Sequence, residues 1–126
     1  MRVEEKRTQE IKEYATDQLE GYKDTEVYGC DLHYELFNTD YYIIGTYKAK
    51  QWLGEDTFDA IERIRDYEQS NFGEVNTDFS DPEKVVNMYV YILGEEILQE
   101  SKTLQDKWNE YLTNEDIDKI IGELKG

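Results

Sequence analysis

Residues 82–97 constrain the fold more than any other part of the sequence. Their apolar side chains recur at intervals of three and four residues, which places them on one side of an α-helix: Val85, Val86, Tyr89, Ile92, Leu93 and Ile97. The start of this helix is also marked, because Ser80 or Asp81 can cap it and Pro82 is tolerated in a first turn. The segment is apolar enough to be the central helix of a hydrophobic core.

Similar signals predict further helices on both sides. The expected helices cover residues 2–22, 31–37, 41–53 and 56–70, then a stretch through 98–112 with a kink near Ser101, and a last short helix after Thr113. The aromatic and β-branched run in 41–47 is also compatible with a strand, but 48–53 is good helix sequence and Gly54 is a typical stop. Asn-Gly or Asp-Gly turns between alternating strands are absent. We therefore predict a single all-α domain, residues 1–126, of five to seven helices.

The net charge restricts the possible partners. The chain carries 30 acidic and 14 basic residues, for a net charge of −16. This charge opposes direct binding to nucleic acid or to an anionic membrane, and it favours salt-sensitive association with basic surfaces. Because the large basic surfaces of a cell are mostly nucleic-acid-binding sites, we expect the partner to be a basic DNA-binding protein or nuclease.

Half of this net charge lies in residues 55–83, which hold ten acids and only two bases, Arg63 and Arg65. In a helix, the acids at 55, 59, 62 and 66 fall within about 60° of one another, opposite Phe58, Ile61 and Ile64. Like charges at this spacing oppose helix formation by a few tenths of a kcal/mol per pair. The face is either simply solvated or kept for a partner. The candidate phosphate-mimicking acids are Glu55, Asp59, Glu62 and Asp66, extended by Glu74, Asp78, Asp81 and Glu83, with Glu95, Glu96 and Glu100 as a second row.

Catalytic and metal-binding patterns are weak. Cys30 and His33 would share a helix side, the minimum for a nucleophile pair or half a metal site, but a surface histidine and a half-buried cysteine are the simpler interpretation. The acids at 76–83 are spaced unlike a calcium-binding loop and lack its glycine. We expect no enzyme activity, no cofactor and no metal. The single cysteine, the charged N-terminal residues and the short apolar runs lead us to expect a cytoplasmic protein without a membrane segment.

Aromatic residues are concentrated in residues 31–45, which include Tyr34, Tyr41 and Tyr42. They either pack beneath the first and the 82–97 helices or form a partner or homodimer surface, where tyrosine is favoured.

Residues 31–53, with the sequence Phe-Gly-Glu-Val-Asn-Thr-Asp at 72–78, resemble small uncharacterised proteins of phages and prophages. The size, the acidity, the helical pattern, Asp-Leu-His at 31–33 and Tyr-Tyr at 41–42 are similar to a phage antirestriction family, named for overcoming classical restriction, whose members mimic DNA. The resemblance implies no catalytic residues and raises the expectation of a role against host defence. The host cytoplasm would then be the location.

Three hypotheses follow. The first is a non-enzymatic DNA mimic that occupies the DNA-binding site of a restriction or CRISPR enzyme. A helical row of carboxylates repeats every 5–6 Å or so and can approximate a row of phosphates. The alternative is a phage-type helical adaptor or regulator that binds a protein through the tyrosine-rich surface. The third is a small hydrolase that uses acids and a divalent ion.

Overall fold

The computed structural model describes the backbone of residues 3–37 and 45–126, and the side chains of residues 5–37 and 59–126. Its elements in chain order are α1 (Val3–Glu20), the 3-10 helix η1 (Gly29–Asp31), α2 (Leu32–Phe37), α3 (Gly45–Phe72), α4 (Pro82–Gln99), α5 (Lys102–Asp106) and α6 (Asn114–Lys125). The described residues contain no strand beyond one isolated bridge between Tyr28 and Tyr111. The predicted all-α class is confirmed.

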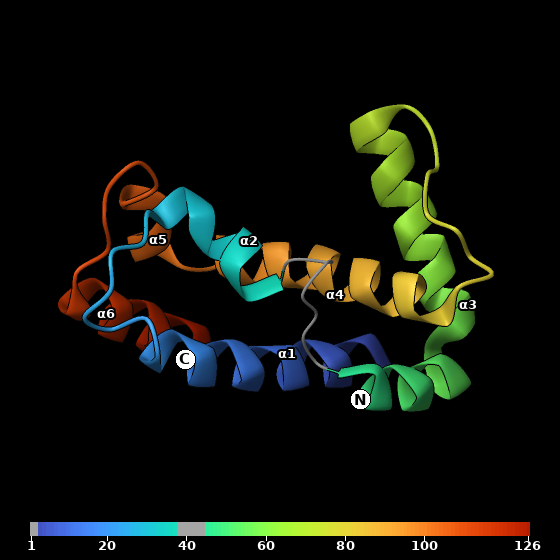
Figure 1. Ribbon diagram of the computed structural model, residues 1–126, viewed down its shortest axis with the longest axis horizontal. Coiled ribbons are helices and arrows are strands. Elements are labelled where there is room, and N and C mark those ends of the chain that lie inside the picture. The colour runs from blue at the N-terminus through green and yellow to red at the C-terminus, as the bar shows by residue number, and fades with distance from the viewer. Residues whose placement is uncertain (1–2, 38–44) are drawn as a thin grey trace.

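Helix α4 is the central element, as its apolar pattern predicts. It contacts α1, α2, α3 and α5, and it lies across the middle of the molecule (Figure 1). Neighbours on several sides explain why it buries nine residues, from Val85 to Leu98. The buried side chains of the described helices form one hydrophobic cluster.

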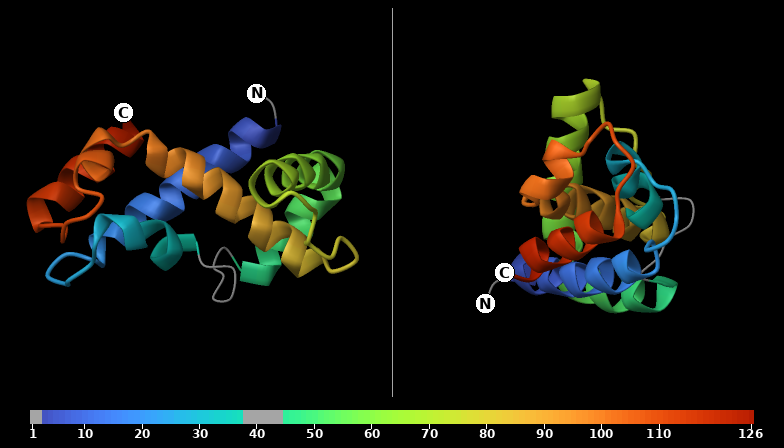
Figure 2. Two further views of the ribbon diagram at one scale, coloured as in Figure 1. Left: turned by 90° about the horizontal axis from the view of Figure 1, so that it is seen from above. Right: turned by 90° about the vertical axis from the view of Figure 1, so that its left-hand side faces the viewer.

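Helix α6 lies beside α1, and α1 in turn packs against α4 (Figures 1 and 2). Helix α1 buries Ile11, Ala15 and Leu19, which recur every four residues. Helix α6 begins at the predicted capping box, in which the Thr113 side chain accepts from the Asp116 backbone and the Asp116 side chain accepts from the Thr113 backbone. These reciprocal bonds satisfy two backbone N–H groups that the helix itself leaves unpaired.

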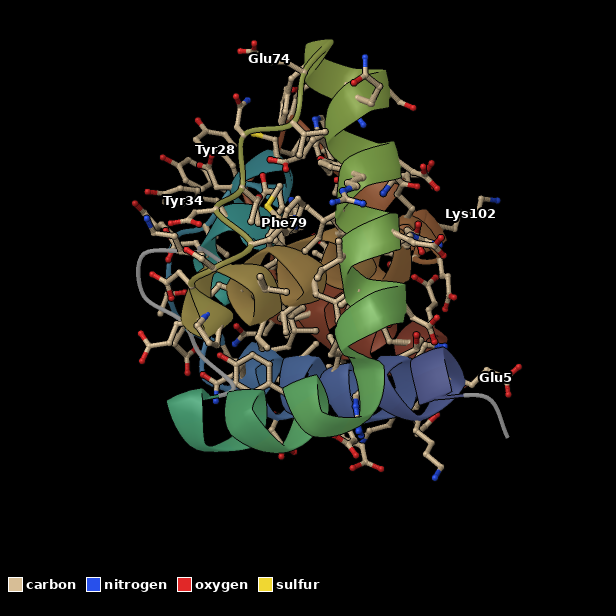
Figure 3. The ribbon with its side chains drawn as sticks, turned by 90° about the vertical axis from the view of Figure 1, so that its right-hand side faces the viewer. Glu5, Tyr28, Tyr34, Glu74, Phe79 and Lys102 are labelled. Carbon is tan, nitrogen blue, oxygen red and sulfur yellow. The ribbon has the colours of Figure 1, made fainter. Side chains whose placement is uncertain are left out.

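The prediction of separate helices at 41–53 and 56–70 is wrong. Helix α3 continues through Gly54 to Phe72. The ribbon bends strongly early in α3, and its later turns stand away from α1 as an arm (Figure 3). Glycine lowers local helix stability, so Gly54 suits a bend although it does not end the helix. The arm, residues 59–72, is held against α4 by the buried side chains of Ala60 and Ile64.

Two further boundaries differ from the predictions. The helical stretch expected through 98–112 is interrupted, because α4 ends at Gln99 and Ser101 caps α5, accepting from the Leu104 backbone. Residues 107–113 then form turn and loop. Asp81, one of the two expected caps, accepts from Glu83 N and Lys84 N at the start of α4, whereas Ser80 instead donates to Asp78.

Candidate functional site

Three acids lie exposed on the outer side of the arm: Asp59, Glu62 and Asp66, called the acidic row below. Ala60 and Ile64, between them in sequence, are buried against α4. The helix therefore packs one face and presents the other to water, as its sequence pattern predicts. Glu55 also belongs to the predicted row, but its side chain lies outside the described residues.

The two bases of the arm both point away from the acidic row. The Arg63 guanidinium pairs with Glu96 of α4. The Arg65 guanidinium lies over the ring of Phe79, 5.1 Å from its centroid. No described residue forms an ion pair or a hydrogen bond with a carboxylate of the acidic row. Among the described residues, the row is therefore a set of uncompensated charges on one face of α3.

The loop after the arm is fixed by a buried carboxylate. Glu68, only 3% exposed, accepts a hydrogen bond of 3.1 Å from the backbone N–H of Thr77. Within the same loop Asp78 accepts from the Ser80 hydroxyl and backbone, and these bonds lower the pKa of Asp78. Asp78, a predicted member of the extended row, therefore already accepts hydrogen bonds within its own loop.

The predicted extension residues differ in how free they are. Glu74 is exposed at the far end of the arm (Figure 3), and Glu83 is exposed in the first turn of α4. Asp78 and Asp81 use side-chain oxygens in a turn and a helix cap. Glu74 and Glu83 are therefore the members whose carboxylates stay available.

The described residues contain no group of three His, Cys, Asp or Glu side chains that could hold a metal ion.

The predicted second row on α4 is engaged within the molecule. Glu95 accepts a hydrogen bond of 2.9 Å from the Tyr67 hydroxyl. Glu96 pairs with Arg63, and Glu100 pairs with Lys12 of α1 at 2.9 Å. Because each partner comes from another helix, sequence spacing could not reveal these contacts.

A second feature is a cavity of about 320 Å³ between α2, α4 and the residues around α5. It is lined by Cys30, His33, Tyr34, Tyr91, Glu95, Leu98, Gln99, Gln105 and Trp108. Cys30 and His33, which the sequence pattern predicts to share one side of a helix, both line this cavity. They are engaged separately, since Cys30 Sγ lies 3.9 Å from Asp31 Oδ1 and His33 Nε2 lies 2.9 Å from the Tyr91 carbonyl oxygen.

The electrostatics of this cavity follow from burial. Burial lowers the pKa of His33, against the opposing effects of the Tyr91 carbonyl and Glu95. Burial also raises the pKa of Tyr91 and of Tyr67, with the Glu95 charge adding to both. At neutral pH the imidazole of His33 and the phenol of Tyr91 are therefore uncharged, and Glu95 is the one carboxylate among the described residues that line the cavity.

Four exposed aromatic residues lie in segments 28–34 and 108–111, and two of them, Tyr34 and Trp108, line the cavity. Tyr28 and Tyr111 stack with ring centroids 4.0 Å apart. Tyr34 is 56% exposed and Trp108 is 39% exposed. We call these four residues the aromatic surface; Tyr28 and Tyr34 project on the same side of the molecule (Figure 3). Tyr34 belongs to the tyrosines predicted from the sequence as a partner surface, whereas the other two, Tyr41 and Tyr42, lie outside the described residues.

Backbone pairing brings the two halves of the aromatic surface together. Gly29 N donates to Glu110 O, Cys30 N to Trp108 O and Leu112 N to Val27 O. A Cβ at Gly29 would overlap the Lys107 carbonyl group, so only glycine allows this approach. Tyr28, Trp108 and Tyr111 were missed because about 80 residues separate the paired segments and no local signal connects them.

Comparisons with protein-family models, curated proteins and solved structures find no match. None of the described helices has the length and apolar character required to cross a membrane.

Proposed function

We propose that this protein is a non-enzymatic inhibitor that binds the DNA-binding site of a basic DNA-processing enzyme and mimics DNA with the acidic row. The observation that carries the proposal is the unpaired state of Asp59, Glu62 and Asp66, while Arg63 and Arg65 on the same helix turn to other partners. A carboxylate that already pairs with a residue of its own protein would contribute less binding free energy to a basic partner than an unpaired carboxylate would.

The geometry of the arm supports this role. Successive members of the acidic row are three and four residues apart, so their side chains lie roughly 5–6 Å from one another. Asp59 and Asp66 are separated by about 10 Å along the helix axis. The arm stands away from α1 with Glu74 at its end (Figure 3), which leaves the row accessible to a groove that normally holds a DNA strand.

The class of target follows from the sequence resemblance to phage antirestriction proteins. A protein of that kind would act on a restriction or CRISPR enzyme of the host. The charge of −16 would accelerate its association with such a basic site and make binding sensitive to salt.

The test is capture of the target from a bacterial host lysate by immobilised protein at low and at high salt, identified by mass spectrometry. We expect a DNA-binding enzyme that is retained at low salt, released at high salt, and displaced by added duplex DNA. A captured protein that is displaced by neither salt nor duplex DNA would contradict the proposal.

A charge-matched pair of variants tests the surface. The triple variant Asp59→Asn, Glu62→Gln, Asp66→Asn should lose the captured enzyme. The control Glu13→Gln, Asp17→Asn, Asp106→Asn removes the same charge from exposed positions on α1 and α5 and should keep it. Equal capture by both variants would show that net charge alone, and not the arm, determines binding.

A second candidate function is a helical adaptor that binds a protein through the aromatic surface. Four exposed rings, two of which line one cavity, favour it, since tyrosine and tryptophan are enriched in protein interfaces. Tyr34→Ala or Tyr111→Ala would then abolish capture at any salt concentration, while the triple variant of the acidic row would bind normally.

A further inference from the structure

The cavity beside the aromatic surface combines aromatic rings with one carboxylate. Tyr34, Tyr91 and Trp108 supply the rings, and Glu95 supplies the charge. Among the described residues, no lysine or arginine lines the cavity. Its lining therefore has a negative charge without an internal counter-ion inside the cavity.

The hydrogen-bonding state of Glu95 leaves part of the carboxylate free. Its Oε2 accepts from the Tyr67 hydroxyl, whereas no described residue donates to Oε1. Glu95 is also partly buried, and an interaction between charges is stronger where water is partly removed. A cation entering the cavity would thus gain more from Glu95 than from an acid on the open surface.

His33 supports the same preference. A carbonyl oxygen only accepts hydrogen bonds, so Nε2 carries the hydrogen that bonds to Tyr91, and Nδ1 of the neutral ring retains its lone pair. Burial keeps this ring neutral, because it lowers the pKa of His33. The histidine therefore adds no positive charge that would repel a cation.

Guanidinium and ammonium groups differ in shape and in the arrangement of their N–H donors. A guanidinium is planar, stacks on aromatic faces and has five N–H donors, whereas an ammonium is a compact and strongly hydrated charge. Trp108 and Tyr34 contribute aromatic rings to the lining, and Glu95, Gln99 and Gln105 contribute side chains with oxygen acceptors.

We propose that this cavity binds a guanidinium group. The source is either an arginine side chain presented by a protein or a free arginine-like metabolite. The inference does not depend on the acidic row, since the cavity lies between α2, α4 and α5 and the row lies on the outer side of α3. The two proposals can therefore fail independently.

The experiment is a nuclear magnetic resonance titration that follows the indole N–H signal of Trp108, assigned by comparison with Trp108→Phe. The probes are N-acetyl-arginine-N-methylamide and the citrulline analogue, which has the same shape without the charge. We expect the arginine compound to shift the Trp108 signal in a saturable manner and the citrulline compound to bind at least about tenfold more weakly, a difference of about 1.4 kcal/mol.

Two variants on adjacent positions provide the control. Glu95→Gln should weaken binding of the arginine compound by about tenfold, because the amide still accepts from Tyr67 but has no charge. Glu96→Gln should leave binding unchanged, since Glu96 pairs with Arg63 outside the cavity. Equal binding of the citrulline compound, no effect of Glu95→Gln, or no saturable shift at all would overturn the proposal.

Free L-arginine distinguishes the two sources. Its carboxylate would meet the negative charge of Glu95 and of the protein, so a site for arginine side chains should prefer the capped compound. Tighter binding of the free amino acid would assign the cavity to a metabolite.

Discussion

Gly94 shows how one residue without a side chain sets the distance between two helices. It is buried in α4, and a Cβ at this position would lie 2.5–2.7 Å from ring atoms of Phe37 in α2. Phe37 is itself buried, with 1% of its surface exposed. The close approach of α2 and α4 around Phe37, on which the cavity wall at His33 and Tyr91 depends, therefore requires glycine at 94.

We expect Gly94→Ala to destabilise the protein. Overpacking a core costs about 1–3 kcal/mol, and the better helix propensity of alanine offsets about 0.5–1 kcal/mol of this. The matched control is Gly122→Ala in α6, where an added Cβ meets nothing within 4 Å and stability should rise. Urea denaturation monitored by circular dichroism measures both. Equal changes in the two variants would contradict the packing argument.

At the scale of single elements, the ends of helices are held by side chains from other elements. Glu123 of α6 accepts from the Ser101 hydroxyl and from the hydroxyl and backbone N–H of Thr103. These bonds tie α6 to the start of α5. Burial raises the pKa of Glu123, but the hydrogen bonds together lower it by a larger amount. The pKa of Glu123 therefore lies below the ordinary value.

A pH dependence follows from this lowered pKa. The stabilisation by ionised Glu123 is complete above the ordinary glutamate pKa and is lost as the pH falls through the lower pKa of the folded state. We expect Glu123→Gln to reduce the free energy of unfolding by about 0.5–1 kcal/mol at neutral pH, and the difference from the wild type to vanish in that acidic range. Denaturation at several pH values checks this. Glu115→Gln, which breaks only an exposed pair with Lys119, should have little effect at neutral pH.

The arm of α3 provides a prediction that separates function from stability. Asp59, Glu62 and Asp66 repel one another at helical spacings, at a cost of a few tenths of a kcal/mol per pair. The triple variant Asp59→Asn, Glu62→Gln, Asp66→Asn should therefore be more stable by about 0.5 kcal/mol while it loses the target. Thermal melting measures the first effect. A less stable triple variant would mean that these acids make structural contacts.

For the whole molecule, the net charge of −16 gives salt two opposite effects. Repulsion among like charges destabilises the compact state, and salt screens it. Added sodium chloride should therefore raise the melting temperature by a few degrees while it weakens binding to the basic target. Parallel melting and capture experiments over one salt series test this. A melting temperature that falls with salt would show that the ion pairs, such as that between Lys12 and Glu100, outweigh the repulsion.

The sequence by itself determined the helical class, the central position of α4 and the exposed acidic face of the arm. These follow from periodicity and capping, which act over a few neighbouring residues, as at Thr113 and Asp116. It also named the candidate phosphate-mimicking acids, but it did not show which of them are paired within the molecule. Tertiary structure decided which of them are free, because Glu96 and Glu100 find their partners on other helices.

Tertiary structure alone also created the cavity and the aromatic surface. Tyr28 and Tyr111 meet through backbone bonds between distant segments, and Glu95 meets His33 only because α2 packs on α4. Helix α3 continues through Gly54 although the local signal predicts a stop there. Local propensities are worth at most about 1 kcal/mol per residue, so contacts between elements override them wherever the two disagree.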